Sequence, residues 1–453
     1  MSFPKYPAYK DSGVEWIGEI PEGWSVSSIK RCSYLKARVG WKGLTSDEFE
    51  ENSYAYLVTG SDFKSSRIQW RQCYQVNKAR YDDDPFIHLI EGDLLITKDG
   101  TVGKLALVEG LDKPACLNSG IFLLRPLHSY LTNFMEWVLR SKLFSHFVDL
   151  RSYGSTINHL YQNVFEEFSF PLPTFSEQKA IASFLECECA KIDALIAEQE
   201  RLITLLQEKR QAVISHAVTK GLEPNVPMKE SGIEWIKKIP SHWKTQQLKL
   251  FSQFVSGATP SKDNLDFWSG NIPWVSPKDM KTHYLLDTHD HISENALSHS
   301  ATRLIQPDNI LIVVRSGILQ RTIPVAINTI PATINQDIKG IILNKKIILP
   351  DFLLFIIQGY TNFFLSVWSK QGATVESIEM KYLENTHVTL PPIAEQQNII
   401  SYLRNKCNTF NKLIKKTKKN TLLLKERRSA LISAAVTGKI DVRTLVKPKD
   451  IAA

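Results

Sequence analysis

The sequence predicts an α+β fold with two globular domains separated by two long helices, which form an antiparallel coiled coil within a pseudo-two-fold internal repeat. The first observation is that residues 12–24 (SGVEWIGEIPEGW) recur as residues 231–243 (SGIEWIKKIPSHW), with eight of thirteen positions identical. Two further blocks recur at an offset of 218 residues, namely 172–185 with 390–403 and 205–219 with 423–437. Because this spacing is far longer than the roughly 50 residues of the largest solenoid repeats, the chain is interpreted as a duplicated domain with connectors.

The blocks divide the chain into five segments. These are a first globular domain with an N-terminal arm at 1–173, a first long helix at 174–220, a linker with a second globular domain at 221–391, a second long helix at 392–438, and a C-terminal tail at 439–453. Between the matched blocks lie residues 25–171 and 244–389, two inserts of nearly equal length whose sequences have diverged strongly. A shared frame around two different inserts suggests two copies of one type of domain, each of which recognises a different target.

Each insert has the pattern of an independent α+β domain. Residues 92–108 (GDLLITKDGTVGKLALV) predict two strands around an Asp-Gly turn, and residues 308–327 repeat the theme around Ser316 and Gly317. Residues 131–150 and 349–369 predict helices.

The first long helix is predicted to run from Ser176, the expected N-cap, to about Val218. Gly221 and Pro224 then end it, as glycine just past a helix and proline soon after usually do. The second is predicted over about 394–436. Its outer face is more basic, with ten Lys or Arg residues between 404 and 428 and a single acid.

Both helices carry apolar residues at heptad spacing, and each would be about 43 residues or roughly 65 Å long. Since each apolar stripe needs a partner, the simplest arrangement pairs the two helices with each other, which would place the inserts at opposite ends of a rod. The predicted seam consists of Leu185, Ile192, Leu195, Leu202, Leu206 and Val213 in the first helix, and Leu403, Phe410, Leu413, Leu424 and Leu431 in the second.

Composition bounds the location and the partners. The net charge of +8 and the pI near 8.9 favour an acidic partner without requiring one. The six cysteines are scattered and have no zinc-ligand spacing, so they are expected to be reduced thiols, with no metal bound. No export signal or membrane-spanning stretch is recognisable, so we expect a cytoplasmic protein without membrane contact.

No catalytic motif is found, and no cofactor is predicted. Residues 100–104 (GTVGK) lack the full phosphate-loop pattern and are better explained as a hairpin turn. Asp93 with Lys98, or the run 82–84, could in principle begin a metal-dependent nuclease site. However, Asn309 occupies the position of Asp93 in the second copy, and no converging second acid is recognisable.

Basic and polar loops in corresponding places of the two inserts favour contact with nucleic acid. They combine Lys and Arg, which suit phosphates, with Ser, Thr, Asn and Gln, which can reach base edges. The candidates in the first insert are Lys36, Arg38, Trp41, Lys42, Lys64, Lys98, Lys104, Arg151, Ser155, Thr156 and Asn158. Those in the second are Thr259, Ser261, Lys262, Lys278, Arg315, Arg321, Lys370, Gln371 and Thr374, with Lys98 and Lys104 corresponding loosely to Arg315 and Arg321.

Residues that are shared by both copies are expected to build the frame, because two targets should be read by different residues. This applies to the tryptophans and to the Glu-Gln pair that precedes each long helix. They are Trp16, Trp24, Glu177 and Gln178 in the first copy, and Trp235, Trp243, Glu395 and Gln396 in the second.

The frame resembles the specificity subunits of type I restriction-modification systems over nearly the whole chain. The motifs that carry the resemblance are EWI..IP..W, LP...EQ and K/R-R-x-A-L/V-I-S-x-A-V-T, in that order in each half. It implies a subunit without a catalytic centre that binds a bipartite double-stranded DNA sequence, one half-site per recognition domain. It also implies two modification subunits, which bind S-adenosylmethionine and methylate adenine, and restriction subunits that cleave DNA with ATP and magnesium.

Two alternatives stay open at this point. One is a stand-alone DNA-modifying enzyme, a nuclease or methyltransferase, with an unrecognised active site. The other is a coiled-coil adaptor that binds protein only.

Overall fold

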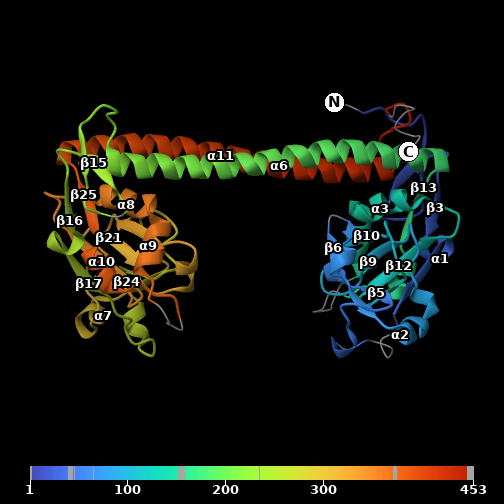
Figure 1. The fold of residues 1–453 in the computed structure, drawn as a ribbon, viewed down its shortest axis with the longest axis horizontal. Helices are drawn as coiled ribbons and strands as arrows, with labels where there is room; N and C mark the ends of the chain where they lie inside the picture. The colour runs from blue at the N-terminus through green and yellow to red at the C-terminus, as the bar shows by residue number, and fades with distance from the viewer. Residues whose placement is uncertain are drawn as a thin grey trace. The chain divides into compact units, whose positions relative to one another are not determined.

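The computed structural model describes residues 3–38, 44, 46–64, 66–151, 159–233, 235–370 and 375–445. The chain divides into two compact units, with Met1–Gln199 and Lys419–Ala453 in unit 1 and Glu200–Lys418 in unit 2. Each unit contains one insert and one part of each long helix (Figure 1). Within the described ranges, every helix is too short or too polar to cross a bilayer.

Unit 1 is built around a six-stranded sheet and a three-stranded sheet. Its strands are β1 (Tyr9–Asp11), β2 (Glu19–Pro21), β3 (Ser25–Ser28), β4 (Ser33–Ala37), β5 (Ala55–Val58), β6 (Phe63–Lys64), β7 (Arg67–Ile68), β8 (Tyr74–Val76), β9 (Leu94–Thr97), β10 (Leu105–Leu107), β11 (Ala115–Leu117), β12 (Ile121–Pro126) and β13 (Ser169–Leu172). Its short helices are α1 (Ile29–Cys32), α2 (Lys78–Asp82), α3 (Thr132–Arg140), α4 (Lys142–Arg151) and α5 (Gln162–Glu166). The larger sheet has the order β4-β12-β9-β10-β7-β6, and the smaller one has the order β11-β5-β8.

Unit 2 repeats this plan with fewer strands. Its strands are β14 (Met228–Glu230), β15 (Lys238–Pro240), β16 (Lys244–Gln247), β17 (Ser252–Ser256), β18 (Ile272–Val275), β19 (Tyr284–Leu285), β20 (Asp290–Ile292), β21 (Ile310–Val313), β22 (Val325–Asn328), β23 (Thr333–Ile334), β24 (Ile338–Leu343) and β25 (His387–Leu390). Its short helices are α7 (Glu294–His299), α8 (Pro350–Gly359), α9 (Thr361–Trp368) and α10 (Met380–Asn385). The larger sheet has the order β17-β24-β21-β22-β19, and a smaller one has the order β20-β18-β23.

Apart from Thr97 at the end of β9, the central strand of each large sheet is apolar, because it is covered on both faces. In β9, Leu94 and Ile96 join the core that contains the long helices, whereas Leu95 joins the core of the smaller sheet. In β21, Ile310 and Leu311 divide in the same way. Side chains alternate along a strand, so a continuous apolar run supplies two cores at once.

The predicted elements of the inserts are confirmed, with one refinement. β9 pairs antiparallel with β10, and β21 with β22, as the two hairpin patterns predict. Each predicted helix that follows the hairpin is present but in two pieces. α3 and α4 are separated at Ser141, and α8 and α9 are separated at Tyr360.

The two long helices are α6 (Phe175–Lys220) and α11 (Ile393–Val436). The predicted extents are confirmed, but Ser176 as N-cap is wrong. Thr174 caps α6, because its side chain accepts from the Glu177 N–H at 3.4 Å while the Glu177 carboxylate accepts from the Thr174 N–H at 3.1 Å. This reciprocal pair is a capping box.

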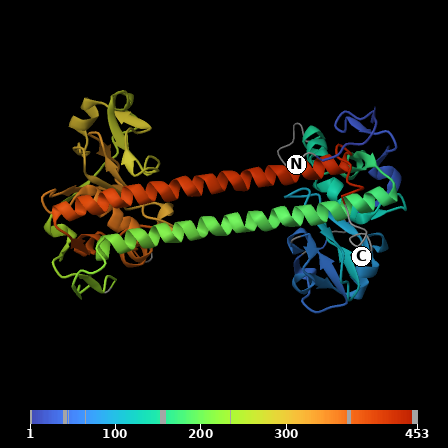
Figure 2. The same ribbon diagram turned by 90° about the horizontal axis from the view of Figure 1, so that it is seen from above.

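Within each unit, the segments of α6 and α11 lie side by side and run in opposite directions (Figures 1 and 2). In unit 1, Leu185 and Ile192 share a core with Leu431, and in unit 2 the end of α6 shares a core with Leu403. Phe410, Leu424, Leu206 and Val213 are partly buried. These eight residues therefore agree with the predicted seam.

Leu195, Leu202 and Leu413 were also predicted in the seam, and that assignment is wrong. Their side chains are 52%, 41% and 44% exposed. The second row of seam positions was placed one residue too early, because Ile196, Ile203 and Ile414, which directly follow these leucines, are partly buried. The leucines therefore lie beside the seam, on the outer surface of the helices.

The Glu-Gln pair at the start of each long helix anchors the unit. The Trp24 indole N–H donates to Glu177 at 3.1 Å, and the Trp243 indole donates to Glu395 at 3.0 Å. Both tryptophans are buried. The expectation that these shared residues build the frame is confirmed.

The glutamines of the pair are buried and bind main chain only. Gln178 accepts from the Leu131 N–H at 2.8 Å, just before α3, and donates to the Pro173 carbonyl at 2.9 Å. Gln396 accepts from the Leu349 N–H at 2.8 Å, just before α8, and donates to the carbonyls of Ile347 and Pro391, both at 2.9 Å. Each glutamine thus joins the long helix to the helix that covers the sheet.

The remaining shared tryptophans also pack inside the frame. Trp16 packs on Phe147, with ring centroids 5.5 Å apart, and Trp235 packs on Tyr360 and Phe364. These contacts lie in the same core as the long helices.

Each insert starts and ends on one strand pair of the frame. β3 pairs antiparallel with β13 in unit 1, and β16 pairs with β25 in unit 2. The two ends of an insert are therefore held side by side by the same ladder, whatever sequence lies between them.

The two ends of the chain meet in unit 1. The Asp441 N–H donates to the Pro4 carbonyl at 2.8 Å, and the Tyr9 hydroxyl donates to the Gly438 carbonyl at 3.1 Å. Val442 is fully buried. In unit 2, the equivalent segment is continuous and leads from α6 to β14.

We expect Gln396→Ala to destabilise unit 2 by about 2–4 kcal/mol, because it leaves one main-chain N–H and two carbonyls buried without a partner. The measurement is the urea midpoint of the whole chain, followed by tryptophan fluorescence. Gln397→Ala is the matched control, since Gln397 is the next residue on the same helix and is exposed. Equal midpoints for the two variants would contradict the anchoring role.

Candidate nucleic-acid interface

A groove of about 750 Å³ in unit 2 brings together three of the predicted DNA-contacting residues. Thr259, Lys262 and Lys278 line it, and both lysines are exposed. The other lining residues are Leu265, Trp268, Trp274, Ser276, Pro277, Asp290, Asn335, Gln336 and Asp337. Two lysines, two aspartates, two amides, two hydroxyls and two indole rings therefore border one concave surface.

The polar side chains of this groove are held in place by their neighbours. The Thr259 hydroxyl donates to Gln336 Oε1 at 2.5 Å, which leaves the Gln336 amide nitrogen free to donate outward. The Trp268 indole donates to the Ser261 carbonyl at 3.0 Å, and its ring packs edge-on against Trp274. A side chain fixed in this way loses little freedom when it binds a ligand.

The glycine that precedes this loop is required by a close approach of two backbones. A Cβ on Gly257 would lie 2.0 Å from the Ile334 carbonyl oxygen, and the Ala258 N–H donates to that same oxygen at 3.1 Å. The main chain around Thr259 can lie against the Asn335 segment only because residue 257 has no side chain.

Two more predicted residues lie at the margin of the groove. Arg315 forms an ion pair with Asp337 at 2.7 Å. Lys370 is beside Arg315, because its N–H donates to the Ser377 carbonyl at 2.9 Å while Arg315 forms a β-bridge with Ser377. Arg321 is not in this groove but lines a neighbouring cavity of about 660 Å³, together with Lys278.

The predicted residues of unit 1 are spread over a wider surface. Lys98 and Lys104 flank the turn between β9 and β10, and the Lys98 ammonium lies 5.6 Å from the Phe122 ring. Lys36 is on edge strand β4, whereas Lys64 is on β6 at the opposite edge of the same sheet. Arg151 forms an ion pair with Glu167 at 2.9 Å.

Arg38 is the exception, and its prediction as a phosphate contact is wrong for this structure. The residue is 2% exposed, and its Nε donates to the Leu117 carbonyl at 2.8 Å. A guanidinium that is bound to main chain inside the unit supports the fold. Residues Trp41, Lys42, Ser155, Thr156, Asn158, Gln371 and Thr374 lie outside the described residues.

The alignment of the two hairpins in the structure is shifted by one residue from the alignment predicted from the sequence. The Leu160 N–H donates to the Lys98 carbonyl, and the Ile378 N–H donates to the Val314 carbonyl. Lys98 is therefore equivalent to Val314. Arg315 is equivalent to Asp99, whose carboxylate pairs with His159. The two units thus place opposite charges at this turn.

The acids that could have begun a nuclease site are engaged in structural contacts. Asp93 is buried and forms an ion pair with Arg125 at 2.7 Å. Asp82 and Asp83 pair with Lys78 and Arg80 on their own helix turn. Over the described part of the chain, no group of three or more His, Cys, Asp or Glu residues could hold a metal ion.

Sequence reasoning missed Trp268, Asn335 and Gln336. They enter the groove from two segments that are about 70 residues apart in sequence and are brought together by the parallel pairing of β18 with β23. The sequence contained one sign of these groove residues: the polar run 335–337 (NQD) lies between β23 and β24, which are mostly apolar.

Comparison with known proteins identifies the family. Residues 37–203 and 240–424 both match the type I restriction modification DNA specificity domain. The chain belongs to this family. The duplicated frame and the resemblance seen in the sequence are therefore confirmed.

Two relatives illustrate the range of similarity within the specificity family. The EcoR124I/EcoR124II specificity subunit of Escherichia coli is 40% identical over 162 residues, which are 36% of this chain and 39% of the relative. The putative MjaX specificity subunit of Methanocaldococcus jannaschii is 25% identical over 443 residues, 94% of this chain and 96% of the relative.

Solved structures share the fold. A chain described in work on the "complex assembly and conformational transition of the type I R-M system" has a TM-score of 0.72 at 15% identity, and the match covers 93% of this chain and 99% of that one. The HsdS subunit of Thermoanaerobacter tengcongensis has a TM-score of 0.54 at 15% identity and covers 93% and 98%.

Proposed function

We propose that this protein is the DNA-reading subunit of a type I restriction-modification complex, in which each unit reads one half of a bipartite DNA target. The observation that carries the proposal is the contrast between an anchored, repeated frame and two inserts with different surfaces. Methylation and cleavage would be carried out by partner subunits, which bind the cofactors.

The groove of unit 2 supplies the chemistry that one half-site needs. Lys262 and Lys278 suit backbone phosphates, whereas Gln336 can donate and accept at a base edge, as glutamine does with adenine. Thr259 orients that amide. In unit 1, the corresponding DNA contacts would be made by Lys36, Lys98 and Lys104 and by the loops that flank them.

We further propose that α6 and α11 form the docking surface for two methyltransferase subunits and, through them, for restriction subunits. The support is the set of leucines that the intramolecular seam leaves exposed. They are Leu195, Leu422 and Leu423 in unit 1, and Leu202, Leu205 and Leu413 in unit 2. Grouped exposed leucines on otherwise charged helices are typical of protein interaction sites.

Lys262→Gln and Lys278→Gln should each weaken DNA binding and reduce the slope of log affinity against log salt by about 1, since each lysine would neutralise one phosphate. Binding is measured on the complex with the methyltransferase subunit over a series of salt concentrations. Lys229→Gln, at an exposed lysine of the frame, is the control. An unchanged slope in both groove variants would place the DNA elsewhere.

Exchange of residues 244–389 for the insert of a relative should change one half-site and leave the other intact, because both ends of the insert lie on the β16–β25 ladder. The measurement is a map of methylated adenines in cells that carry the complete system. Exchange of residues 25–171 is the reciprocal experiment. A map in which both half-sites change in either exchange would refute independent reading.

Leu195→Lys and Leu202→Lys should each weaken association with the methyltransferase subunit by about tenfold, because each places a charge in a desolvated contact. Co-purification and sedimentation of the mixed subunits measure the effect. Ala194→Lys, at the exposed residue adjacent to Leu195, controls for added charge. Equal losses in the control would mean that charge alone, and not the leucine surface, decides assembly.

A further inference from the structure

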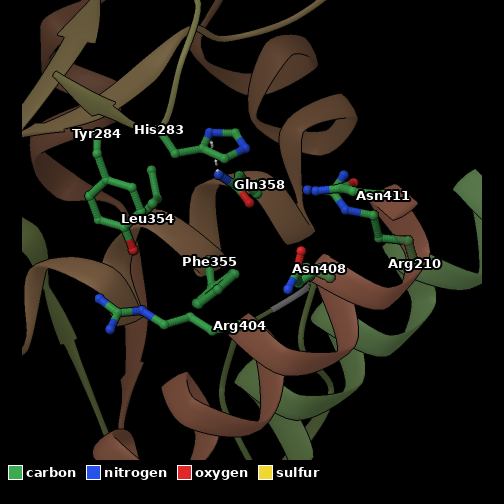
Figure 3. Close-up of a pocket in the computed structure, with 10 residues that line it drawn as sticks. Arg210, His283, Tyr284, Leu354, Phe355, Gln358, Arg404, Asn408 and Asn411 are labelled. Atoms are coloured by element: carbon green, nitrogen blue, oxygen red, sulfur yellow. Dashed lines mark hydrogen bonds between the residues drawn. The ribbon is translucent and has the colours of Figure 1, made fainter. Parts of the chain in front are cut away.

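A second cavity of unit 2 lies between the long helices and the insert, away from the DNA-reading groove. It has a volume of about 450 Å³ (Figure 3). Its walls come from α6, α8, α11 and the segment that begins β19. The lining residues are Arg210, His283, Tyr284, Leu354, Phe355, Gln358, Arg404, Cys407, Asn408 and Asn411.

The repeat shows what the arginine of this cavity binds elsewhere in the chain. Arg210 is equivalent to Arg428 in the second helix, since the two lie 218 residues apart within matched blocks. In unit 1, Arg428 Nε lies 2.8 Å from the Asp193 carboxylate. The residue equivalent to Asp193 in unit 2 is Asn411. The arginine is retained, and its carboxylate is missing.

The surroundings of the two arginines are otherwise alike. Cys189 lies beside Arg428 and Cys407 lies beside Arg210, at equivalent positions of the repeat, and burial raises the pKa of both thiols. A further difference is that Asn408 stands where unit 1 has Ala190. Unit 2 thus replaces one acid and one methyl group with two amides that can donate hydrogen bonds to an anion.

Two polar atoms of the cavity, Arg210 Nε and Gln358 Oε1, are buried and make no hydrogen bond within the described residues. Arg428 Nε also lacks a hydrogen bond of good geometry there, but the Asp193 carboxylate lies beside it. The Gln358 amide nitrogen is 3.0 Å from His283 Nδ1. Figure 3 shows the Arg210 guanidinium and the amides of Gln358 and Asn408 directed toward the same space. Buried polar atoms usually have a hydrogen-bond partner, so these atoms can bind a group that enters the cavity.

The electrostatics of the cavity favour an anion. The residues that line the cavity include no acid, and the nearby Asp351 pairs with Arg404 at 2.7 Å and accepts a hydrogen bond from the Tyr284 hydroxyl. Burial and the nearby Arg210 lower the pKa of His283, so the imidazole is neutral at pH 7. Among the lining residues, the Arg210 guanidinium therefore holds a positive charge without a carboxylate partner.

We propose that this cavity binds the carboxylate of an Asp or Glu side chain that a partner polypeptide inserts. The carboxylate would take the place that Asp193 has beside Arg428, with Asn408 and Asn411 as further donors. A main-chain N–H of the same segment would donate to Gln358 Oε1, and Leu354 with Phe355 would contact its apolar part. The partner's identity as a methyltransferase subunit rests on the proposed function, but the carboxylate specificity does not.

The isolated chain tests the carboxylate directly, with capped aspartate (N-acetyl-aspartate methylamide) as the probe. Capped aspartate should raise the melting temperature of the wild-type chain more than equal concentrations of capped asparagine or inorganic phosphate. Asn411→Asp, which supplies the carboxylate internally, and Arg210→Gln, which removes its counter-ion, should both abolish the response. Asp193→Asn in unit 1 is the matched control and should retain it.

An equal response to capped asparagine, a stronger response to phosphate, or a response that survives in Asn411→Asp would overturn the proposal. Because Asn411→Asp restores the pair seen in unit 1, its own melting temperature should not fall. This variant keeps the test valid even if Arg210→Gln unfolds.

Association with the methyltransferase subunit tests the source of the carboxylate. Asn411→Asp should weaken it on the order of tenfold, as expected for the loss of hydrogen bonds to a charged group, and Asp193→Asn should leave it unchanged. Equal association of both variants would overturn the partner as the source. If even the wild-type chain failed to bind the subunit, the proposed function would fail instead. The capped-aspartate response would then still test whether the cavity binds a carboxylate.

Discussion

The fold depends on the Glu-Gln pair with which each long helix begins. The glutamate accepts an indole N–H, and the glutamine is buried among main-chain groups. Together they hold three segments at one point: the entry strand region, the helix that covers the sheet, and the long helix. A buried amide bound only to main chain tolerates few substitutes, because any apolar replacement leaves several main-chain groups without partners. The same two residues therefore stand at the same point in both halves of the chain.

This constraint explains why the rest of each insert is free to differ. The anchors contact only the start of α3 or α8 and the frame, so residues at the distant end of the sheet do not enter their hydrogen bonds. The hairpin turns illustrate the result. The backbone bond from Leu160 to Lys98 is reproduced by Ile378 and Val314, yet the next residue is Asp99 in one unit and Arg315 in the other. Geometry is retained while the charge at the surface is reversed.

The sequence was sufficient for the repeat, the long helices, the hairpins and the structural role of the shared tryptophans, because all of these are expressed in local patterns or in the comparison of the two halves. It was insufficient where tertiary contact decides. Leu195, Leu202 and Leu413 have the right residue type for a seam, but the isoleucine that directly follows each of them is the partly buried residue. Arg38 has the residue type of a surface charge, but it is buried, with the Leu117 carbonyl and the Cys116 sulfur among its hydrogen-bond acceptors. Gln336 could not be associated with Thr259 without the parallel pairing of strands that are distant in sequence.

The contact between the N-terminal segment and the segment after α11 in unit 1 sets the order in which the two units can fold during synthesis. Unit 2 is one uninterrupted stretch, Glu200–Lys418, and all of its contacts are available before the last part of α11 has been synthesised. Unit 1 needs Leu431, Ile432 and Val442 for its core, and these residues are synthesised after the whole of unit 2. Domains usually fold in the order of their synthesis. Here the first insert to be translated waits for residues that follow unit 2, so the N-terminal half stays open to chaperones or to misassembly until those residues have been added.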